Sequence, residues 1–198
     1  MSGAVILAAG EARRAGGPKL VWPIEGRPSV RRVAEAALGA ARVAETLLVL
    51  GGPWEDLVRE AVGGLNLKIV PNPDYRLGQS ASLKRGLAEL APGRRALIFL
   101  LADQPFITSQ IIDDLLEFQE KKRASIAAPA YGGRRVNPVV FDLGRWRAEM
   151  MALAGDSGAR SLLTAHPGEL ALWPADAWPE KCFTDFDTPE EYERLSGG

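Results

Sequence analysis

The chain has 198 residues, of which 46% are hydrophobic and 25% are charged, and its formal net charge is −1. These proportions are typical of a globular protein and exclude a disordered chain. The balance of 24 basic and 25 acidic residues excludes a general nucleic-acid coat and a polybasic membrane binder. No apolar run approaches the roughly 20 residues that span a bilayer, and the apolar start lacks the basic region of a signal peptide. We therefore expect a soluble, cytoplasmic protein without nucleic-acid or membrane partners.

Two residue types limit the chemistry further. Cys182 is the one cysteine and His166 the one histidine. An internal disulfide, a cysteine-based zinc site and a Ser-His-Asp triad are therefore disfavoured. We expect Cys182 to be a buried packing residue and His166 to lie at a helix end.

Short apolar runs alternate with amphipathic stretches of helical length along the chain. In chain order, strands are expected at 5–9, 46–50, 67–70, 96–101, 125–130, 136–141 and 170–173. Helices are expected at 28–41, 53–62, 80–90, 108–120, 143–153, 159–165 and 188–195. Thr108 is a suitable N-cap, and Thr188-Pro189-Glu190-Glu191 has the spacing of a capping box with proline at the first helical position.

Strands without alternation, separated by helices, favour a mostly parallel sheet that is covered on both faces. We predict an α/β fold in which residues 1–198 form a single domain. Its sheet is doubly wound and Rossmann-like. The regular alternation weakens after about residue 106, where further strands are expected as additions to the sheet. Ligands of such sheets bind beyond the carboxyl ends of the strands.

The loop after the first strand, residues 10–19, combines glycines with positive charge. Glycines let the backbone approach an anion closely, and Arg14 and Lys19 supply charge that suits a triphosphate. The spacing fits neither G-x-G-x-x-G nor G-x-x-x-x-G-K-[ST], so a dinucleotide fingerprint and a P-loop are both excluded. The composition alone is equally consistent with a solvated loop that carries ordinary surface charges.

Residues 7–19, which read LAAGEARRAGGPK, resemble the L-A-A-G-x-S-x-R-M-G-x-x-K motif of the MobA-like nucleotidyltransferases. Within that family the chain most resembles the CTP:molybdopterin cytidylyltransferase branch. Further segments agree in the expected order, namely NPD at 72–74, GQSASL at 78–83, LADQP at 101–105, NPV at 137–139, GDSGAR at 155–160 and DTPE at 187–190. Ala12 and Ala15 depart from the usual Ser and Met of the first motif.

The resemblance implies a fold like that of the nucleotide-diphospho-sugar transferases and a nucleoside triphosphate bound along the first loop. The nucleotide-binding residues that it implies are Leu7, Ala8, Ala9, Gly10, Gly16, Ser80 and Ser82. It gives catalytic roles to Arg14 and Lys19 at the β- and γ-phosphates and to Asp103, and it makes Asp103 and Asp187 ligands of Mg²⁺. Mg²⁺ prefers oxygen ligands, typically one or two carboxylates with phosphate oxygens and water.

The same resemblance places a second substrate beside the later motifs. The acceptor-binding residues are then Asn137, Asp156, Gly158 and Arg160. Residues up to about 105 would bind the nucleotide, and residues 106–198 would form most of the acceptor site. The implied reaction is transfer of CMP from CTP to a molybdopterin-type molybdenum cofactor, with release of pyrophosphate. A receiving molybdoenzyme would be a further partner.

Several alternatives stay open at this point. Asp103 and Asp187 are also explained as helix-capping residues, Ser80 as a helix N-cap, and the GDSGAR segment as a turn. Leu-Ala-Ala-Gly favours cytidylyl over guanylyl transfer, but another nucleotide or another acceptor, such as phospholactate or a sugar phosphate, would use the same chemistry. A non-catalytic nucleotide-binding chaperone would bind nucleotide without releasing pyrophosphate.

Overall fold

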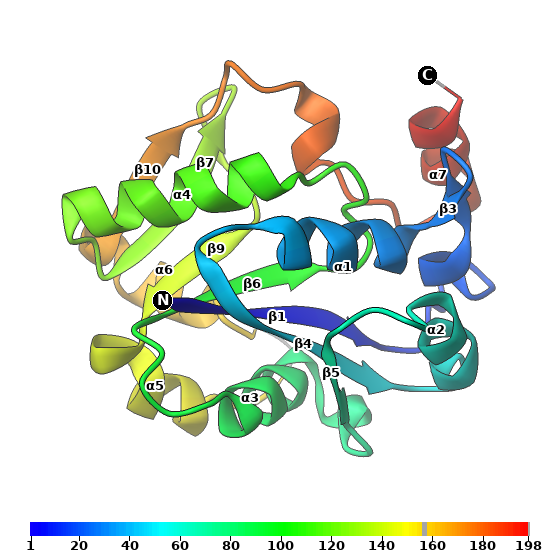
Figure 1. Ribbon diagram of the computed structural model, residues 1–198, viewed down its shortest axis with the longest axis horizontal. Helices are drawn as coiled ribbons and strands as arrows, with labels where there is room; N and C mark the ends of the chain where they lie inside the picture. Colours follow the sequence, from blue (N-terminus) through cyan, green and yellow to red (C-terminus); the bar gives the residue numbers. More distant parts are fainter. Residues whose placement is uncertain (156–157, 198) are drawn as a thin grey trace.

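The computed structural model describes residues 1–155 and 158–197, and its centre is an eight-stranded sheet (Figure 1). The strand order is β10-β7-β9-β6-β1-β4-β5, and β8 pairs with β7. The strands are β1 (Ser2–Ala9), β4 (Val43–Gly51), β5 (Lys68–Pro71), β6 (Ala96–Leu101), β7 (Ile126–Tyr131), β8 (Arg134–Arg135), β9 (Val139–Asp142) and β10 (Leu170–Pro174).

The strands that the first half of the chain contributes to this sheet are all parallel. β1 lies between β4 and β6, and β5 continues the sheet beside β4. The later strands extend the same sheet, with β9 antiparallel to both β6 and β7, and with β10 parallel to β7. The predicted mostly parallel α/β sheet is therefore confirmed, and so is the expectation that the later strands are additions to it.

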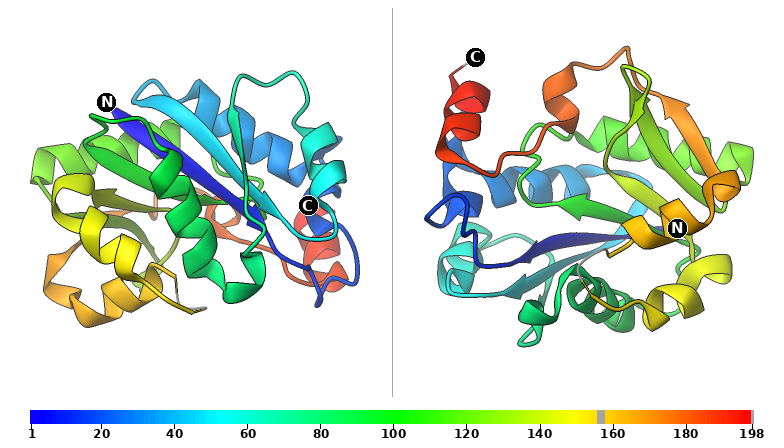
Figure 2. Two further views of the ribbon diagram at one scale, coloured as in Figure 1. Left: turned by 90° about the horizontal axis from the view of Figure 1, so that it is seen from below. Right: turned by 180° about the vertical axis from the view of Figure 1, so that it is seen from behind.

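Helices cover both faces of the sheet. They are α1 (Ser29–Gly39), α2 (Glu55–Ala61), α3 (Gln79–Glu89), α4 (Ser109–Lys122), α5 (Leu143–Ala152), α6 (Arg160–Ala165) and α7 (Pro189–Ser196). Single 3₁₀ turns are η1 (Lys19–Val21), η2 (Tyr75–Leu77), η3 (Pro167–Glu169) and η4 (Glu180–Phe183), and β2 (Pro23–Ile24) pairs with β3 (Arg27–Pro28). In Figure 1, and from behind in Figure 2, α1 and α4 lie on one side of the sheet and α3 and α5 on the other.

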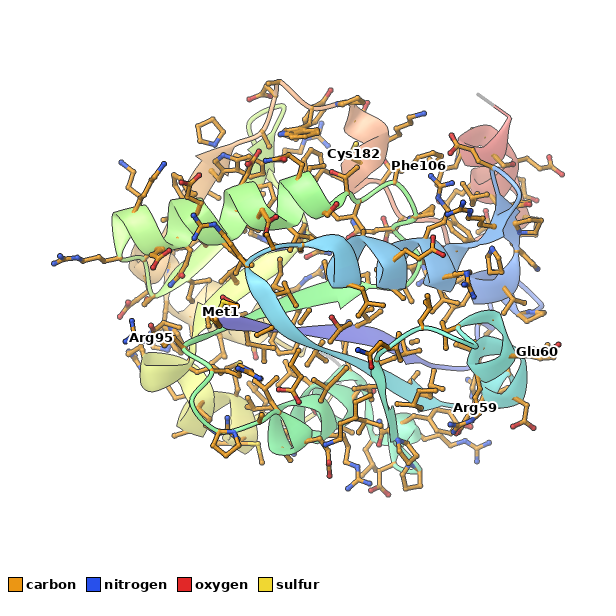
Figure 3. The ribbon with its side chains drawn as sticks, in the orientation of Figure 1. Met1, Arg59, Glu60, Arg95, Phe106 and Cys182 are labelled. Atoms are coloured by element: carbon orange, nitrogen blue, oxygen red, sulfur yellow. The ribbon has the colours of Figure 1, made fainter. Side chains whose placement is uncertain are left out.

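Successive residues of β1 enter two different cores. Ala4 and Ile6 pack in the cluster that contains the buried faces of α1 and α4, whereas Val5 packs in the cluster of α3 and α5. Figure 3 shows side chains filling the space between the sheet and the helices on both sides. Because both faces of the strand are buried, its sequence is a continuous apolar run rather than an alternating one.

Several predicted boundaries differ from the structure by one to three residues, among them one strand start and two helix starts. The strand expected at 136–141 begins only at Val139, because Pro138 has no N–H to donate to a ladder. The helix expected from residue 53 begins at Glu55. Ser80 is not an N-cap, since it lies inside α3 and Gly78 precedes that helix.

Two capping predictions are confirmed. The Thr108 side chain accepts a hydrogen bond from the Ile111 N–H at the start of α4. At the start of α7, Thr188 and Glu191 form the expected reciprocal capping box. Both helices therefore start where local side-chain chemistry requires.

The two remaining expectations concern Cys182 and His166. Cys182 is buried in η4, as expected (Figure 3). His166 directly follows α6, and its ring packs edge-on against Trp146 with centroids 4.9 Å apart.

Within residues 1–155 and 158–197, no helix has both the length and the hydropathy needed to cross a membrane.

Parallel strands bring their carboxyl ends to one edge of the sheet. Figure 1 shows β1 and β4 pointing toward the side occupied by α2 and α7. The first loop follows β1 there, and Asp103 follows β6. This edge is where ligands of open α/β sheets bind.

Candidate active site

A cavity of about 860 Å³ lies at this edge and gathers residues from distant parts of the chain. The predicted site residues that line it are Leu7, Ala8, Ala9, Gly10, Arg14, Lys19, Ser82, Asp103, Asn137, Arg160 and Asp187. Among the described residues, Gly16, Ser80 and Gly158 are not part of its lining. Asp156 lies outside the described residues.

The three residues outside the lining each support a neighbour. Gly16 has a φ of +67°, a left-handed conformation that glycine adopts without strain, and it turns the first loop before Lys19. The backbone N–H of Ser80 donates to the Gly155 carbonyl at 3.3 Å. Gly158 lies against the cavity-lining Gln79 side chain and has a φ of +48°, a left-handed conformation that favours glycine.

Lys19 is the centre of a compact ionic cluster. Its side chain is 11% exposed, and its Nζ donates to Asp103 Oδ2 at 2.6 Å and to Asp187 Oδ1 at 2.7 Å. A third hydrogen bond, of 2.8 Å, goes to the Phe186 carbonyl. An ammonium group has three N–H donors, so all of them have protein partners.

Arg14 joins the same cluster from the first loop. Its guanidinium lies 2.8 Å from Asp187 Oδ2, and its side chain is 74% exposed. Asp187 therefore holds Arg14 with one oxygen and Lys19 with the other. We call Arg14, Lys19, Asp103 and Asp187 the paired cluster, because two cations and two carboxylates neutralise one another in it.

Burial and charge shift two pKa values in the paired cluster. Burial raises the pKa of Asp103, the Lys19 ammonium opposes that shift, and nearby Asp185 and Asp187 add to it. Burial lowers the pKa of Lys19, but Asp103 and Asp187 outweigh this effect and the pKa lies above its ordinary value. Lys19 is therefore cationic at neutral pH.

Aromatic packing and backbone hydrogen bonds hold Asp187 in place. The preceding residue, Phe186, is fully buried and its ring stacks on Trp22 with centroids 6.3 Å apart. The Asp187 N–H donates to Glu191 Oε2 at 2.7 Å, so the capping box of α7 also orients the carboxylate-bearing residue. Asp187 thus serves a helix start and the cavity together.

Gln104 links the Asp103 loop to the C-terminal segment. Its buried side chain donates to the Phe183 carbonyl at 2.8 Å. The same segment brings Asp185 into the cavity lining. Sequence reasoning assigned no role to Gln104 or Asp185; a polar residue within the 101–105 motif and a third acidic residue beside Asp187 were the available signals.

Ser82 is held by the 72–74 motif. Asn72 donates from Nδ2 to Ser82 Oγ at 2.9 Å and accepts from the Asp74 N–H at 3.2 Å. Both Asn72 and Ser82 are buried. The motif at 72–74 therefore positions the cavity-lining hydroxyl of Ser82. The spacing between the motifs at 72–74 and 78–83 does not reveal this contact.

Arg135 is a further cavity residue that the sequence did not single out. It lies on β8, and Arg160 begins α6, yet both line the cavity. Burial lowers the pKa of Arg135, and the positive charge of Arg160 lowers it further. Within the described residues, neither guanidinium has a carboxylate partner. We call Arg135 and Arg160 the arginine pair; Arg135 precedes Asn137-Pro138 by only two residues, which was the available signal.

The donor set of the paired cluster fits a divalent cation. Two carboxylates converge on one positively charged nitrogen, at 2.6 and 2.7 Å, so a cation already lies between them. Among the described residues there is no cluster of three or more Asp, Glu, His or Cys side chains arranged for a metal ion. Two carboxylates, completed by phosphate oxygens and water, are a usual environment for Mg²⁺.

Residues 4–170 match the MobA-like NTP transferase domain. The chain belongs to this family. It is therefore a nucleotidyltransferase, and the family resemblance read from the motifs is confirmed. The match extends across both charge groups of the cavity except for Asp187, which lies beyond residue 170.

Two relatives of this chain align with it over nearly its whole length. Nicotine blue oxidoreductase of Paenarthrobacter nicotinovorans is 33% identical over 96% of this chain and 94% of its own length. Molybdenum cofactor guanylyltransferase of Rhodobacter capsulatus is 29% identical over 96% of this chain and 92% of its own. Among solved structures, the Rv0371c homologue from Mycobacterium sp. strain JC1 superposes with a TM-score of 0.86 at 29% identity, covering 99% of this chain and 95% of that one.

Proposed function

We propose that this chain is a Mg²⁺-dependent cytidylyltransferase that transfers CMP from CTP to a molybdopterin-type molybdenum cofactor and releases pyrophosphate. One observation carries the proposal: a single cavity joins the backbone of the Leu-Ala-Ala-Gly loop, the paired cluster and the arginine pair. Nucleotidyl transfer needs these three parts, because a nucleotide, a charge-neutralising centre and an anionic acceptor must meet in one place.

The nucleotide is assigned to the half of the chain up to about residue 105. Its base would lie against the backbone of Ala8, Ala9 and Gly10, which line the cavity, and Ser82 would lie near the base or ribose. Arg14 and Lys19 would contact the β- and γ-phosphates, since both cations lie at the cavity on the first loop and η1. A guanidinium and an ammonium are the side chains that bind phosphate most strongly.

Asp103 and Asp187 are assigned to the divalent cation. Their carboxylates converge at the cavity, and oxygen donors suit Mg²⁺ and Mn²⁺. When bound, the ion would neutralise phosphate charge at the reacting phosphorus. Support comes from a protein of the same fold, Rv0371c of Mycobacterium tuberculosis, which was solved in complex with manganese.

The binding site of the acceptor is assigned to residues 106–198. Together with the nucleotide-binding part, residues 1–198 would act as one nucleotidyltransferase domain. The arginine pair would bind an acceptor phosphate. Asn137, which lines the same cavity, would also contact the acceptor. An acceptor oxygen would attack the α-phosphorus in line with the departing pyrophosphate. No covalent nucleophile is required, and positioning and charge neutralisation carry the catalysis. The relative named molybdenum cofactor guanylyltransferase supports a molybdenum cofactor as acceptor, from which a molybdoenzyme would receive the product.

The preference for CTP is the finest part of the proposal. Ala9 ends β1 and lines the cavity, and its methyl group occupies space that a glycine would leave open to a purine. A pyrimidine can lie close to such a backbone and be recognised by its N–H and C=O groups. Because one relative is named a guanylyltransferase, GTP is the competing nucleotide.

The decisive experiment measures pyrophosphate release from each of the four ribonucleoside triphosphates, with and without molybdopterin cofactor, in Mg²⁺ and in EDTA. We expect release with CTP, cofactor and Mg²⁺ together, and little release when any one is omitted. Release from GTP with cofactor would replace cytidylyl by guanylyl transfer. Nucleotide binding without release under any condition would instead support a chaperone and overturn the enzymatic assignment to this acceptor.

A further inference from the structure

The paired cluster has a property that goes beyond the roles assigned to its members. Lys19 donates its three N–H groups to Asp103, Asp187 and the Phe186 carbonyl. It cannot donate to a phosphate without giving up at least one of these partners. Lys19 therefore has two competing sets of partners, the carboxylates and the triphosphate.

The carboxylates have the same conflict. Asp103 and Asp187 lie 2.6 and 2.7 Å from a buried ammonium group, and Arg14 takes the second oxygen of Asp187. A divalent cation that binds these oxygens meets two positive charges beside it. Either the cation stays weakly bound, or Lys19 and Arg14 move to other partners.

We infer that Lys19 and Arg14 are built-in counter-ions of the metal-binding carboxylates, and that the divalent cation and the triphosphate replace these ion pairs together. The inference rests on the proposed function and specifies how its site is loaded. A cation that binds alone displaces two positive charges, which then have no new partner. A triphosphate that binds alone leaves two partly buried carboxylates without a partner. When both bind, every charge of the paired cluster regains an opposite charge.

The consequence is positive coupling between metal and nucleotide. Each ligand binds weakly without the other, and by linkage each strengthens the other by the same factor. Couplings between ligand sites are commonly about 5- to 150-fold in affinity. The site therefore favours the metal–triphosphate complex over free metal and over metal-free nucleotide.

The test uses Mn²⁺ alone as the probe, on the full chain without nucleotide, and measures the loss of the free aqueous Mn²⁺ signal by electron paramagnetic resonance. Lys19→Gln should bind Mn²⁺ at least about fivefold more tightly than the wild type, at the lower limit of ordinary coupling. Arg14→Gln should give a smaller gain, because Arg14 contacts only Asp187 and is largely exposed.

Arg135→Gln is the matched control. It removes a positive charge from the same cavity, but Arg135 forms no ion pair with a carboxylate within the described residues. Its Mn²⁺ affinity should equal that of the wild type. If Lys19→Gln and Arg14→Gln bind Mn²⁺ no more tightly than Arg135→Gln, the inference is wrong. Circular dichroism shows whether Lys19→Gln folds. If it does not fold, the Mn²⁺ affinity of Arg14→Gln tests the inference, because Arg14 is largely exposed and its replacement leaves the fold intact.

A reciprocal measurement uses CTP in EDTA, followed by isothermal titration calorimetry. Asp187→Asn releases Arg14 and weakens the hold on Lys19, so metal-free CTP should bind severalfold more tightly than to the wild type. Unchanged or weaker binding would overturn the inference. Pyrophosphate release by the wild type tests the proposed function separately: release without these affinity changes overturns the coupling alone, and absence of release overturns the function whatever Mn²⁺ does.

Discussion

The cavity holds two groups of charges that are arranged in opposite ways. In the paired cluster, Lys19 lies 2.6–2.8 Å from two carboxylates and a carbonyl, and Arg14 lies 2.8 Å from Asp187. In the arginine pair, burial and the nearby positive charge of Arg160 lower the pKa of Arg135, and neither guanidinium is paired with a carboxylate among the described residues.

The difference indicates two kinds of ligand. A balanced cluster gains little from a lone ion, because any newcomer breaks an existing pair before it makes its own. Two adjacent guanidiniums gain directly from an anion, which relieves their repulsion and accepts their hydrogen bonds. We therefore expect the paired cluster to select a neutralised metal–triphosphate complex and the arginine pair to select an acceptor phosphate.

The largest expected effect comes from Asp103→Asn. The amide cannot supply the carboxylate's charge, so turnover should fall by about 10²–10³, comparable to the loss of a preorganised charge-stabilising group. The fold should persist, because Lys19 keeps Asp187 and the Phe186 carbonyl. The rate of pyrophosphate release at saturating Mg²⁺ checks this, and near wild-type turnover would remove Asp103 from the reaction.

Asp187→Asn should reduce turnover in the same direction. If Asp103 and Asp187 hold one ion, the double variant should be no slower than the slower single variant, because groups that act as a unit are not additive. Multiplicative losses in the rate of pyrophosphate release would show that the two carboxylates act independently.

Lys19→Gln should lower the free energy of unfolding. Removing one member of a buried charge group costs about 3–5 kcal/mol of unfolding free energy, and we expect a value near the lower limit because Asp187 is 30% exposed. Arg14→Gln, whose side chain is 74% exposed, should cost only about 0–1 kcal/mol. Urea denaturation of both variants measures the contrast; equal losses would mean that the buried ammonium has no special structural role.

Arg135→Gln tests the other charge group. A hydrogen bond to a charged group is worth about 1.5–3 kcal/mol, so KM for the acceptor should rise by at least about tenfold. KM for CTP should stay unchanged, because the nucleotide is assigned to the paired cluster and the first loop. Steady-state kinetics, with each substrate varied in turn, measures the two KM values. A rise in KM for CTP in place of the rise for the acceptor would assign Arg135 to the nucleotide site.

The smallest expected effect concerns the choice of nucleotide at Ala9. At 100 times its dissociation constant, CTP with Mg²⁺ should stabilise the wild type by about 2.7 kcal/mol. That corresponds to a rise in Tm of about 5–10 °C for a chain of this size. GTP at the same concentration should shift Tm less, and Ala9→Gly should narrow the gap. Equal or larger shifts with GTP would defeat the preference for CTP and leave the family assignment intact.

Local sequence signals predicted most of the fold. Continuous apolar runs identified β1 and β6, and short-range side-chain chemistry identified the caps at Thr108 and Thr188. The prediction failed where a local signal was ambiguous. Ser80 has the residue type of an N-cap but is buried inside α3, because Gly78 takes the position before the helix.

The site shows the same division. Motif resemblance selected Lys19, Asp103 and Asp187 one at a time, and all three line the cavity. The motifs did not show that these residues bind one another, nor that Gln104 ties the Asp103 loop to the C-terminal segment. Arg135 was missed because none of the quoted motifs includes it, although it lies two residues before the motif at 137–139.

By itself, the sequence determined the α/β class, the strands β1, β4, β5 and β6, the helix caps and the membership in a nucleotidyltransferase family. These features depend on neighbours within a few turns of chain or on contiguous motifs. Only the tertiary structure decided which charges are paired. Lys19 is 84 residues from Asp103 and 168 from Asp187, and the parallel sheet brings them to one edge. Coulombic pairing and hydrogen bonding depend on distance in space, and distance along the chain does not encode it.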